Sequence, residues 1–315
     1  MAEKITGISP ELMILPGETI ADVLNDRDMT QAELAASTGF TKAYINSVIR
    51  GKKSISAKLA KRLEYVFDVP MSFWLNLQAN YDAERQEYDE RHNITEEEKR
   101  IAKGDLREVV AYFADANELP ADQTDDAMVL SLRKILRVSS LTNLKNVGMQ
   151  GAFRMSDGAE ANPYVMGAWL RICQKSWQGE PLDTAFRREN ADSLLSELRE
   201  IMHSNQQDKQ REIGEIRETM RKHGIVFTVV RSFQGAPVHG YISKRANGSY
   251  AMTVTSREPQ ELFWFSIFHE LGHICKGKVV KKVKFVDYDR DSEDERTADE
   301  FAKKQLADGM FDVVH

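Results

Sequence analysis

Residues 263–277, FWFSIFHELGHICKG, contain His269, Glu270 and His273 in the pattern H-E-x-x-H. On an α-helix, residues four apart lie almost above one another, so both imidazoles can face one metal ion with Glu270 beside it. Zinc held by three protein ligands keeps a fourth position for water and lowers the pKa of that water to about 7. The pattern therefore predicts a Zn²⁺ site in a hydrolase, with His269 and His273 as ligands and Glu270 as general base.

A half-exposed surface helix that happens to carry two histidines and a glutamate is the alternative interpretation. The flanking residues argue against it, because they are apolar almost all round the helix and so predict burial. They are Phe263, Trp264, Phe265, Ile267, Phe268, Leu271 and Ile274. Buried histidine and glutamate side chains need polar or metallic partners, which favours the metal site.

A third metal ligand is expected in residues 291–306, DSEDERTADEFAKKQL, which read as an acidic turn followed by a helix. Glu295 and Asp299 lie four apart and share a helix face. We expect Glu295 to be the third zinc ligand and Asp299 to accept the spare ring N–H of a ligating histidine. The competing carboxylates are Glu293, Asp294 and Glu300.

The composition is that of an ordinary globular protein, with 315 residues, 42% hydrophobic and 29% charged, and the length allows two or three domains. The apolar runs end well before the ~18 residues that a membrane helix needs, and the N-terminus lacks the pattern of a secretory signal. Two distant cysteines, Cys173 and Cys275, fit a reducing compartment. We therefore expect a cytoplasmic protein with no membrane contact.

Residues 42–63 form a basic block, with seven lysines and arginines and no acidic residue, although the net charge of the chain is -6. The surrounding signals predict short helices: one over 16–26, a second begun by a capping box of Thr30 and Glu33, and a third from Thr41 to Arg50. Gly39 supplies the turn between the last two. This spacing predicts a helix-turn-helix, against the alternative of a helical bundle that merely has a basic face.

The third of these helices would read DNA. We expect its N-terminal part to face base edges and the residues after it to hold phosphates. The predicted DNA-contacting residues are Gln31, Thr41, Lys42, Ala43, Tyr44, Asn46, Arg50, Lys52 and Lys53.

Residues 30–63, TQAELAASTGFTKAYINSVIRGKKSISAKLAKRL, resemble the Cro/repressor-type (XRE) helix-turn-helix. The continuation, VFDVPMSFWLNLQANYDAE, is similar to the tail of HigA-type antitoxins. The resemblance implies a homodimer that binds a palindromic operator in double-stranded DNA, with an apolar helix face after Ser72 used for dimerisation.

We expect four segments along the chain. They are a helix-turn-helix domain over residues 1–80, a charged helical linker over 81–104, a helical spacer over 105–220 and, over 221–315, the domain that carries the predicted zinc site. Within the last segment, 224–230, 238–243 and 250–255 read as short strands. The fold class expected is mainly α, with a small α+β zincin (gluzincin-like) domain at the C-terminal end.

The strand order and the spacing from HELGH to Glu295 and Asp299 resemble the ImmA/IrrE-type metallopeptidases, over roughly residues 220–306. The resemblance implies His269, His273 and Glu295 as zinc ligands, Glu270 as general base and Asp299 as a supporting group. A stabiliser for the developing oxyanion is also needed, and the candidates near strand ends are His239, Tyr241 and His223.

The leading hypothesis is a DNA-binding zinc metalloendopeptidase that binds an operator as a dimer and cuts a regulatory protein, either in trans or within its own linker. One alternative is an antitoxin-type autorepressor whose peptidase fold serves as a platform for a cognate toxin or a sensed ligand. A second alternative is a protease toxin restrained by a partner.

Overall fold

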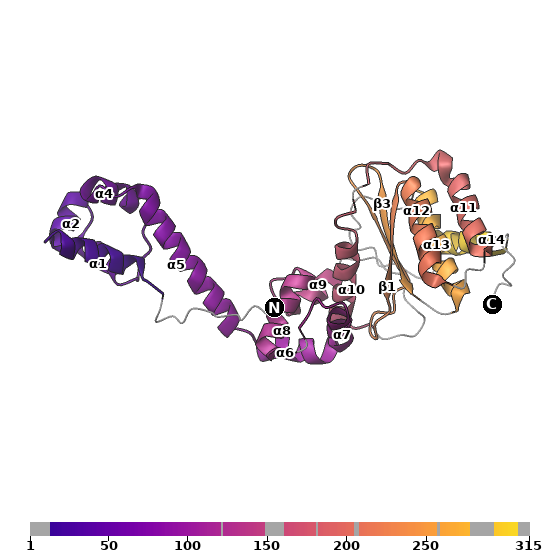
Figure 1. Ribbon diagram of the computed structural model, residues 1–315, viewed down its shortest axis with the longest axis horizontal. Coiled ribbons are helices and arrows are strands. Elements are labelled where there is room, and N and C mark those ends of the chain that lie inside the picture. The colour runs from indigo at the N-terminus through magenta and orange to yellow at the C-terminus, as the bar shows by residue number, and fades with distance from the viewer. Residues whose placement is uncertain are drawn as a thin grey trace. The chain divides into compact units, whose positions relative to one another are not determined.

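The computed structural model describes residues 13–120, 122–148, 161–180, 182–204, 208–256, 259–277 and 293–307. The chain forms two compact units, Met1–Thr95 and Glu96–His315. The described residues are mostly helical and contain one sheet of three strands (Figure 1). None of the described helices is both long enough and apolar enough to cross a membrane.

The first unit consists of α1 (Pro16–Asp26), α2 (Gln31–Thr38), α3 (Lys42–Ile49), α4 (Ala57–Phe67) and α5 (Met71–His92). The predicted capping box is present at the start of α2: Thr30 Oγ1 accepts from the backbone N–H of Glu33, and the Glu33 carboxylate accepts from that of Thr30. Gly39 ends α2 in the left-handed conformation, with φ of +65°. The turn that the sequence predicts between α2 and α3 is therefore confirmed.

The core of the first unit lies between these helices. Its largest buried side chains are Phe67 and Trp74, from α4 and α5. Gly17 lets α1 approach α3 closely, since a methyl group at Gly17 would lie 2.3 Å from the carbonyl oxygen of Ile49. The 22 residues of α5 run without interruption from this core into the charged segment that was predicted as a linker.

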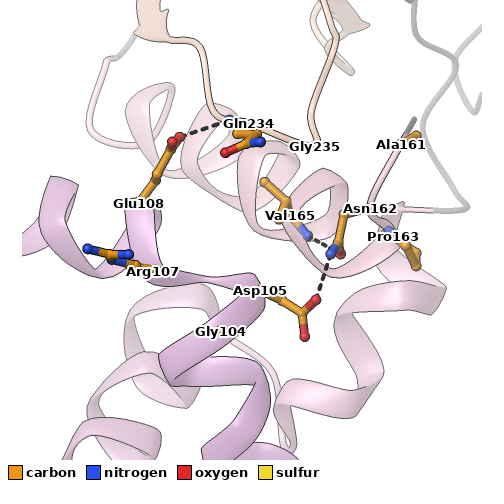
Figure 2. Close-up of a pocket in the computed structure, with 10 residues that line it drawn as sticks. All are labelled: Gly104, Asp105, Arg107, Glu108, Ala161, Asn162, Pro163, Val165, Gln234 and Gly235. Carbon is orange, nitrogen blue, oxygen red and sulfur yellow. Dashed lines mark hydrogen bonds between the residues drawn. The ribbon is translucent and has the colours of Figure 1, made fainter. Parts of the chain in front are cut away.

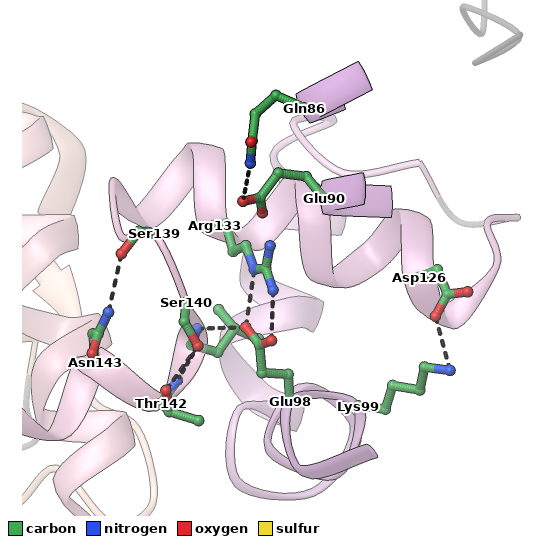
Figure 3. A network of polar contacts seen from close by, with 11 residues as sticks. Gln86, Glu90, Glu98, Lys99, Asp126, Arg133, Ser139, Ser140, Thr142 and Asn143 are labelled. Carbon is green, nitrogen blue, oxygen red and sulfur yellow. Dashed lines mark hydrogen bonds and ion pairs between the residues drawn. The ribbon is translucent and has the colours of Figure 1, made fainter. Parts of the chain in front are cut away.

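The second unit begins with a helical group: α6 (Glu96–Arg100), a π-helical turn η2 (Ile101–Asp105), α7 (Arg107–Asp115), α8 (Asp125–Leu136), η3 (Leu141–Asn143), α9 (Leu144–Gly148) and α10 (Pro163–Ser176). Glu98 ties three of these elements together (Figure 3). Its carboxylate, 2% exposed, accepts from Arg133 of α8 at 2.9 and 2.5 Å and from the backbone N–H of Leu141 at 2.8 Å. Burial alone would raise the pKa of Glu98, but these partners outweigh it and hold the pKa below its ordinary value.

The sheet and its helices follow: η4 (Arg188–Asn190), α11 (Ala191–His203), α12 (Lys209–Lys222), β1 (Ile225–Arg231), β2 (Gly240–Lys244), β3 (Tyr250–Ser256), α13 (Gln260–Cys275) and α14 (Glu293–Ala307). The strand order is β1-β3-β2, so β3 is central. It pairs in parallel with β1 and antiparallel with β2. The three predicted strands are therefore present, and β2 lies at one edge.

Helices cover both faces of this sheet (Figure 1). One face carries α10, and the other carries α11, α12, α13 and α14. Alternation along the strands separates two kinds of packing. Phe227, Met252 and Val254 join the apolar core with α13, whereas Thr228 and Thr253 bond to each other and to side chains at the end of α10. The helical group predicted as a spacer thus packs on the same sheet as α13 and belongs to the same compact unit.

Candidate metal centre and nucleic-acid interface

Three candidate ligand residues, His269, His273 and Glu295, meet between α13 and α14. The Nε2 atoms of His269 and His273 lie 3.1 Å apart, and they lie 3.2 and 3.3 Å from the two carboxylate oxygens of Glu295. Two atoms bound to one tetrahedral zinc ion, at about 2.0–2.1 Å from it, are about 3.3–3.4 Å from each other. The nitrogen and oxygen atoms of this group therefore fit one zinc ion in both chemistry and spacing.

Asp299 contacts the rear of this group. Its Oδ1 lies 2.8 Å from Nδ1 of His269, which is only 1% exposed. A carboxylate only accepts, so Nδ1 of His269 carries a proton and donates it to Asp299, and with a metal ion bound Nε2 would offer its lone pair to that ion. This is the role expected for Asp299 beside a metal ligand.

The pKa of Glu295 is lower than that of an ordinary carboxyl. Burial opposes its ionisation, but the hydrogen bonds with His269 and His273 outweigh burial and keep the pKa well below its usual range. Glu295 is therefore a carboxylate, the form that binds a metal ion.

Close helix packing brings α14 near enough to supply Glu295. Gly272 of the HELGH pattern has no side chain, and a methyl group there would lie 3.2 Å from the α-carbon of Ala298. The other end of α13 is anchored by Glu212 of α12, a buried carboxylate that accepts from Gln260 at 2.8 Å and from the Trp264 indole at 3.1 Å. Both contacts fix the position and rotation of the helix that carries the two histidines.

Glu270 lies against the edge strand β2. A methyl group built on Gly240, the first residue of β2, would lie 2.2 Å from Oε1 and 2.6 Å from Cγ of Glu270. Only glycine fits against this carboxylate, which is 6% exposed in total. Gly240 is not among the residues predicted from the sequence, although a glycine within a strand pattern is a known signal for a close approach by another group.

Two of the three oxyanion candidates lie away from the histidines. Tyr241 follows Gly240, so it points to the opposite face of the sheet, where its ring stacks on Trp177 with centroids 5.1 Å apart. His223 lies at the end of α12 and bonds through Nε2 to Glu197 of α11 at 2.9 Å. His239 precedes Gly240, and its carbonyl accepts from the backbone N–H of Thr255. Tyr241 and His223 therefore do not lie at the metal group. The sequence predicts the strand β2 but does not show which of its faces meets α13.

The predicted reading helix, α3, is short, and its exposed residues are Lys42 and Ala43 at its N-terminal end. Thr41 caps it by accepting from the backbone N–H of Tyr44, and Asn46 donates to the Gln31 side chain of α2 at 3.2 Å. Ile45 and Val48 are buried beneath it. Among the predicted DNA-contacting residues, the exposed ones are Thr41, Lys42, Ala43, Arg50, Lys52 and Lys53. The basic side chains of this group are therefore available to an anionic partner.

A stacked aromatic pair, which sequence reasoning missed, contacts basic side chains near α3. The rings of Phe40 and Tyr44 lie parallel with centroids 4.6 Å apart. The ammonium of Lys53 lies 5.1 Å above Tyr44, while Lys58 and Arg62 lie over Phe40. Cation–π contacts of this kind hold flexible side chains near one place. The i, i+4 spacing of the two aromatic residues was the signal that could have found the pair.

Comparison with known proteins identifies the first unit. Residues 20–74 match the helix-turn-helix family model. The N-terminal unit contains an XRE-type helix-turn-helix domain. The virulence-associated protein A' of Dichelobacter nodosus is 38% identical to the chain over 68 residues, which are 21% of this chain and 59% of that protein. The chain thus spans about three fifths of the length of this curated relative.

Solved structures that are similar to about a quarter of the chain include antitoxin and antidote proteins and a protein in complex with operator DNA. The antitoxin HigA of Pseudomonas aeruginosa, solved with the higBA promoter, is 32% identical, with 27% of this chain and 97% of that one covered and a TM-score of 0.24. A HigA-family antidote protein from Coxiella burnetii is 31% identical, covering 26% and 96%, with a TM-score of 0.24. A further structure from Pseudomonas aeruginosa, of a protein in complex with its operator DNA, is 35% identical, covering 23% and 80%, with a TM-score of 0.23.

Proposed function

We propose that this protein is a DNA-binding regulator whose second unit is a zinc metallopeptidase with a zincin-type fold related to the ImmA/IrrE group. The observation that carries the proposal is the group of His269, His273 and Glu295, whose ligand atoms lie 3.1–3.3 Å apart. Two further observations support the proposal. Asp299 contacts Nδ1 of His269, and Glu270 directly follows His269 on α13.

Zinc bound by these three residues would supply a Lewis acid that lowers the pKa of water and polarises a carbonyl group. The protein's own contribution is proton transfer by Glu270, which takes a proton from the attacking water and passes it to the leaving amine. Within the described sheet, the edge strand β2 pairs with a strand on one side only, so its other side offers an extended peptide a backbone to align with, beside Glu270. Peptide hydrolysis is the reaction that these groups support best.

The helix-turn-helix domain would hold the proposed peptidase at a DNA site. Relatives with this domain are solved on operator or promoter DNA, and the exposed lysines and arginines around α3 suit phosphate binding. We propose that the protein binds a palindromic operator as a homodimer and cuts a regulatory protein in trans, or its own chain.

Peptidase action is tested with Glu270→Gln. The full-length wild-type chain, loaded with zinc, is expressed together with its genomic neighbours, and the cleaved peptides are compared by mass spectrometry with those of the variant. Cleavage products that depend on Glu270 are expected, with Glu261→Gln on the same helix as the matched control. The proposal fails if zinc-loaded wild type and Glu270→Gln give the same products.

An antitoxin-type autorepressor is the second candidate, because the matched region consists of the helix-turn-helix domain alone. In that case the second unit binds a toxin or another partner without cutting it. Repression of a reporter by the Glu270→Gln variant at wild-type strength, together with loss of repression in the Lys42→Ala, Asn46→Ala double variant, would favour this function.

DNA recognition is expected to separate into two kinds of contact. Asn46→Ala should reduce the discrimination between operator and random DNA, by about 1–3 kcal/mol for the base pair that it contacts. Lys52→Ala should weaken binding to both DNAs alike and lower the slope of log affinity against log salt by about 1. Binding titrations at several salt concentrations measure both quantities. The same response from both variants would contradict this division.

A further inference from the structure

A polar pocket of about 830 Å³ lies in the second unit, where the helical group meets the connection between β1 and β2. Its wall is formed by η2 and α7 on one side, by the start of α10 on another and by Gln234 and Gly235 of the connection (Figure 2). The residues of the candidate metal centre do not line it. The pocket is therefore a second candidate site with chemistry of its own.

The pocket is built from specific contacts. Asn162 caps α10 through Oδ1 and donates through Nδ2 to Asp105 at 2.7 Å, and its backbone N–H donates to the Gly235 carbonyl. Glu108 Oε2 accepts from the backbone N–H of Gln234 at 2.8 Å. These bonds attach the β1–β2 connection to the helical group and define the walls.

Gly104 lines the pocket and belongs to the π-helical turn η2. Gly104 lies in the π-helical turn, where Leu106 N–H bonds to the Ile101 carbonyl, and a methyl group at Gly104 would meet no atom within 4 Å. Isolated π-turns occur frequently at functional sites. The space beside the α-carbon of Gly104, a residue that lines the pocket, is therefore unfilled.

The charged side chains that line the pocket differ in how many hydrogen-bond or ion-pair partners they already have within the protein. Both oxygens of Asp105 are engaged, one by Asn162 and the other by Arg100 at 3.0 Å. Glu108 uses Oε2 for Gln234. Among the described residues, Arg107 has no hydrogen-bond or ion-pair partner and lines the pocket beside Glu108. Among the described lining residues, one cation and one carboxylate oxygen are thus left for a ligand.

We propose that this pocket binds a small zwitterion of the amino-acid or dipeptide class, with the ligand carboxylate on Arg107 and its ammonium group on Glu108. Arg107 offers the fork of donors that a carboxylate prefers. The Gln234 amide adds a donor and an acceptor for a peptide group. Pro163 and Val165 supply an apolar wall for a short side chain.

The test is calorimetric titration of the full-length protein with L-alanyl-L-alanine. N-acetyl-L-alanine, which keeps only the carboxylate, and L-alaninamide, which keeps only the ammonium group, serve as half-ligands. We expect the dipeptide to bind with a Kd of about 1 mM or tighter. Each half-ligand should bind at least about tenfold more weakly, because it lacks one charge-assisted contact.

Two variants assign the contacts. Arg107→Ala and Glu108→Gln should each weaken dipeptide binding about tenfold or more, and Glu108→Gln retains an acceptor for the Gln234 N–H. The matched controls are Arg187→Ala and Glu200→Gln, which change exposed residues outside the pocket and should leave the Kd unchanged. The proposal is overturned if no heat is detected at 10 mM dipeptide, if a half-ligand binds as tightly as the dipeptide, or if both pocket variants bind like wild type.

Discussion

At the scale of single residues, Gly240 and Asp299 affect the position of Glu270 and the tautomer of His269 at the candidate metal centre. Neither would bind the metal, yet each contacts a residue that is proposed to act there. Gly240 leaves space for the Glu270 carboxylate, and Asp299 sets the tautomer of His269. Their substitution separates proton transfer from metal binding, which substitution of the histidines cannot do.

Gly240→Ala is expected to remove Glu270 from its position without loss of the metal. The new methyl group would lie 2.2 Å from Glu270 Oε1, so the carboxylate must rotate away. Peptide cleavage should fall about a hundredfold or more, the range of general-base contributions, while zinc content stays at one ion per chain. Gly214→Ala in α12, where a methyl group meets nothing within 4 Å, is the control and should keep full activity. Unchanged cleavage in Gly240→Ala would refute this role.

Asp299→Asn is expected to weaken zinc binding about 10- to 100-fold, the usual cost of losing a group that orients a histidine ligand. The hydrogen bond concerned is the one at 2.8 Å from His269 Nδ1. Competition with a zinc chelator measures the affinity. Glu300→Gln, on the same helix and exposed, should bind zinc like wild type. Equal affinities for Asp299→Asn and wild type would show that this hydrogen bond does not support the metal.

At the scale of elements, the Glu98–Arg133 pair determines how α6, α8 and η3 join. Removal of one partner leaves the other charge nearly buried, since the Arg133 side chain is only 12% exposed. Glu98→Ala should therefore lower the free energy of unfolding of the second unit by about 3–5 kcal/mol. Urea denaturation measures this change, and the exposed neighbour Glu97→Ala should alter it by less than about 0.5 kcal/mol. A loss of under 1 kcal/mol in Glu98→Ala would contradict this account.

The same pair predicts a dependence of stability on pH. The folded-state pKa of Glu98 lies below the ordinary value of 4.5, so its contribution to stability is complete above about pH 4.5. It is lost as the pH falls through the lowered folded-state value, because the unfolded chain then binds the proton first. Unfolding curves between pH 7 and pH 3 should show a smaller loss in Glu98→Gln than in wild type. A loss of equal size would exclude Glu98 as the source.

Much of this arrangement could be predicted from local sequence. The capping box of Thr30, the turn at Gly39 and the three strands depend on neighbours in the chain, and the structure confirms them. The approach of Gly240 to Glu270 and the direction of Tyr241 could not be predicted, because both depend on which face of β2 meets α13. That face is fixed by pairing with β3, in which the partners of Gly240 and Tyr241 are Val254 and Thr253. The bond between Glu98 and Arg133 joins residues 35 apart and leaves no local pattern.

At the scale of the whole molecule, the two units are expected to respond differently to zinc. The candidate ligands all belong to the second unit. At a zinc concentration 100 times the Kd, this unit should gain about 2.7 kcal/mol against unfolding. Hydrogen exchange should slow across β1, β3 and α13 and stay unchanged in α1 to α4. His273→Ala should abolish the effect. Equal protection of both units, or protection that persists in His273→Ala, would contradict a zinc site at this place.

The separation of the candidate ligands along the chain has a consequence for protein synthesis. The first unit ends at Thr95, whereas Glu295, the third ligand, emerges from the ribosome about 200 residues later. At about 5–20 residues per second, this interval lasts roughly 10–40 s. A nascent chain can therefore fold its helix-turn-helix domain while His269, His273 and Glu295 cannot yet meet. The proposed peptidase has a built-in delay, during which the growing chain cannot cut the proteins around it.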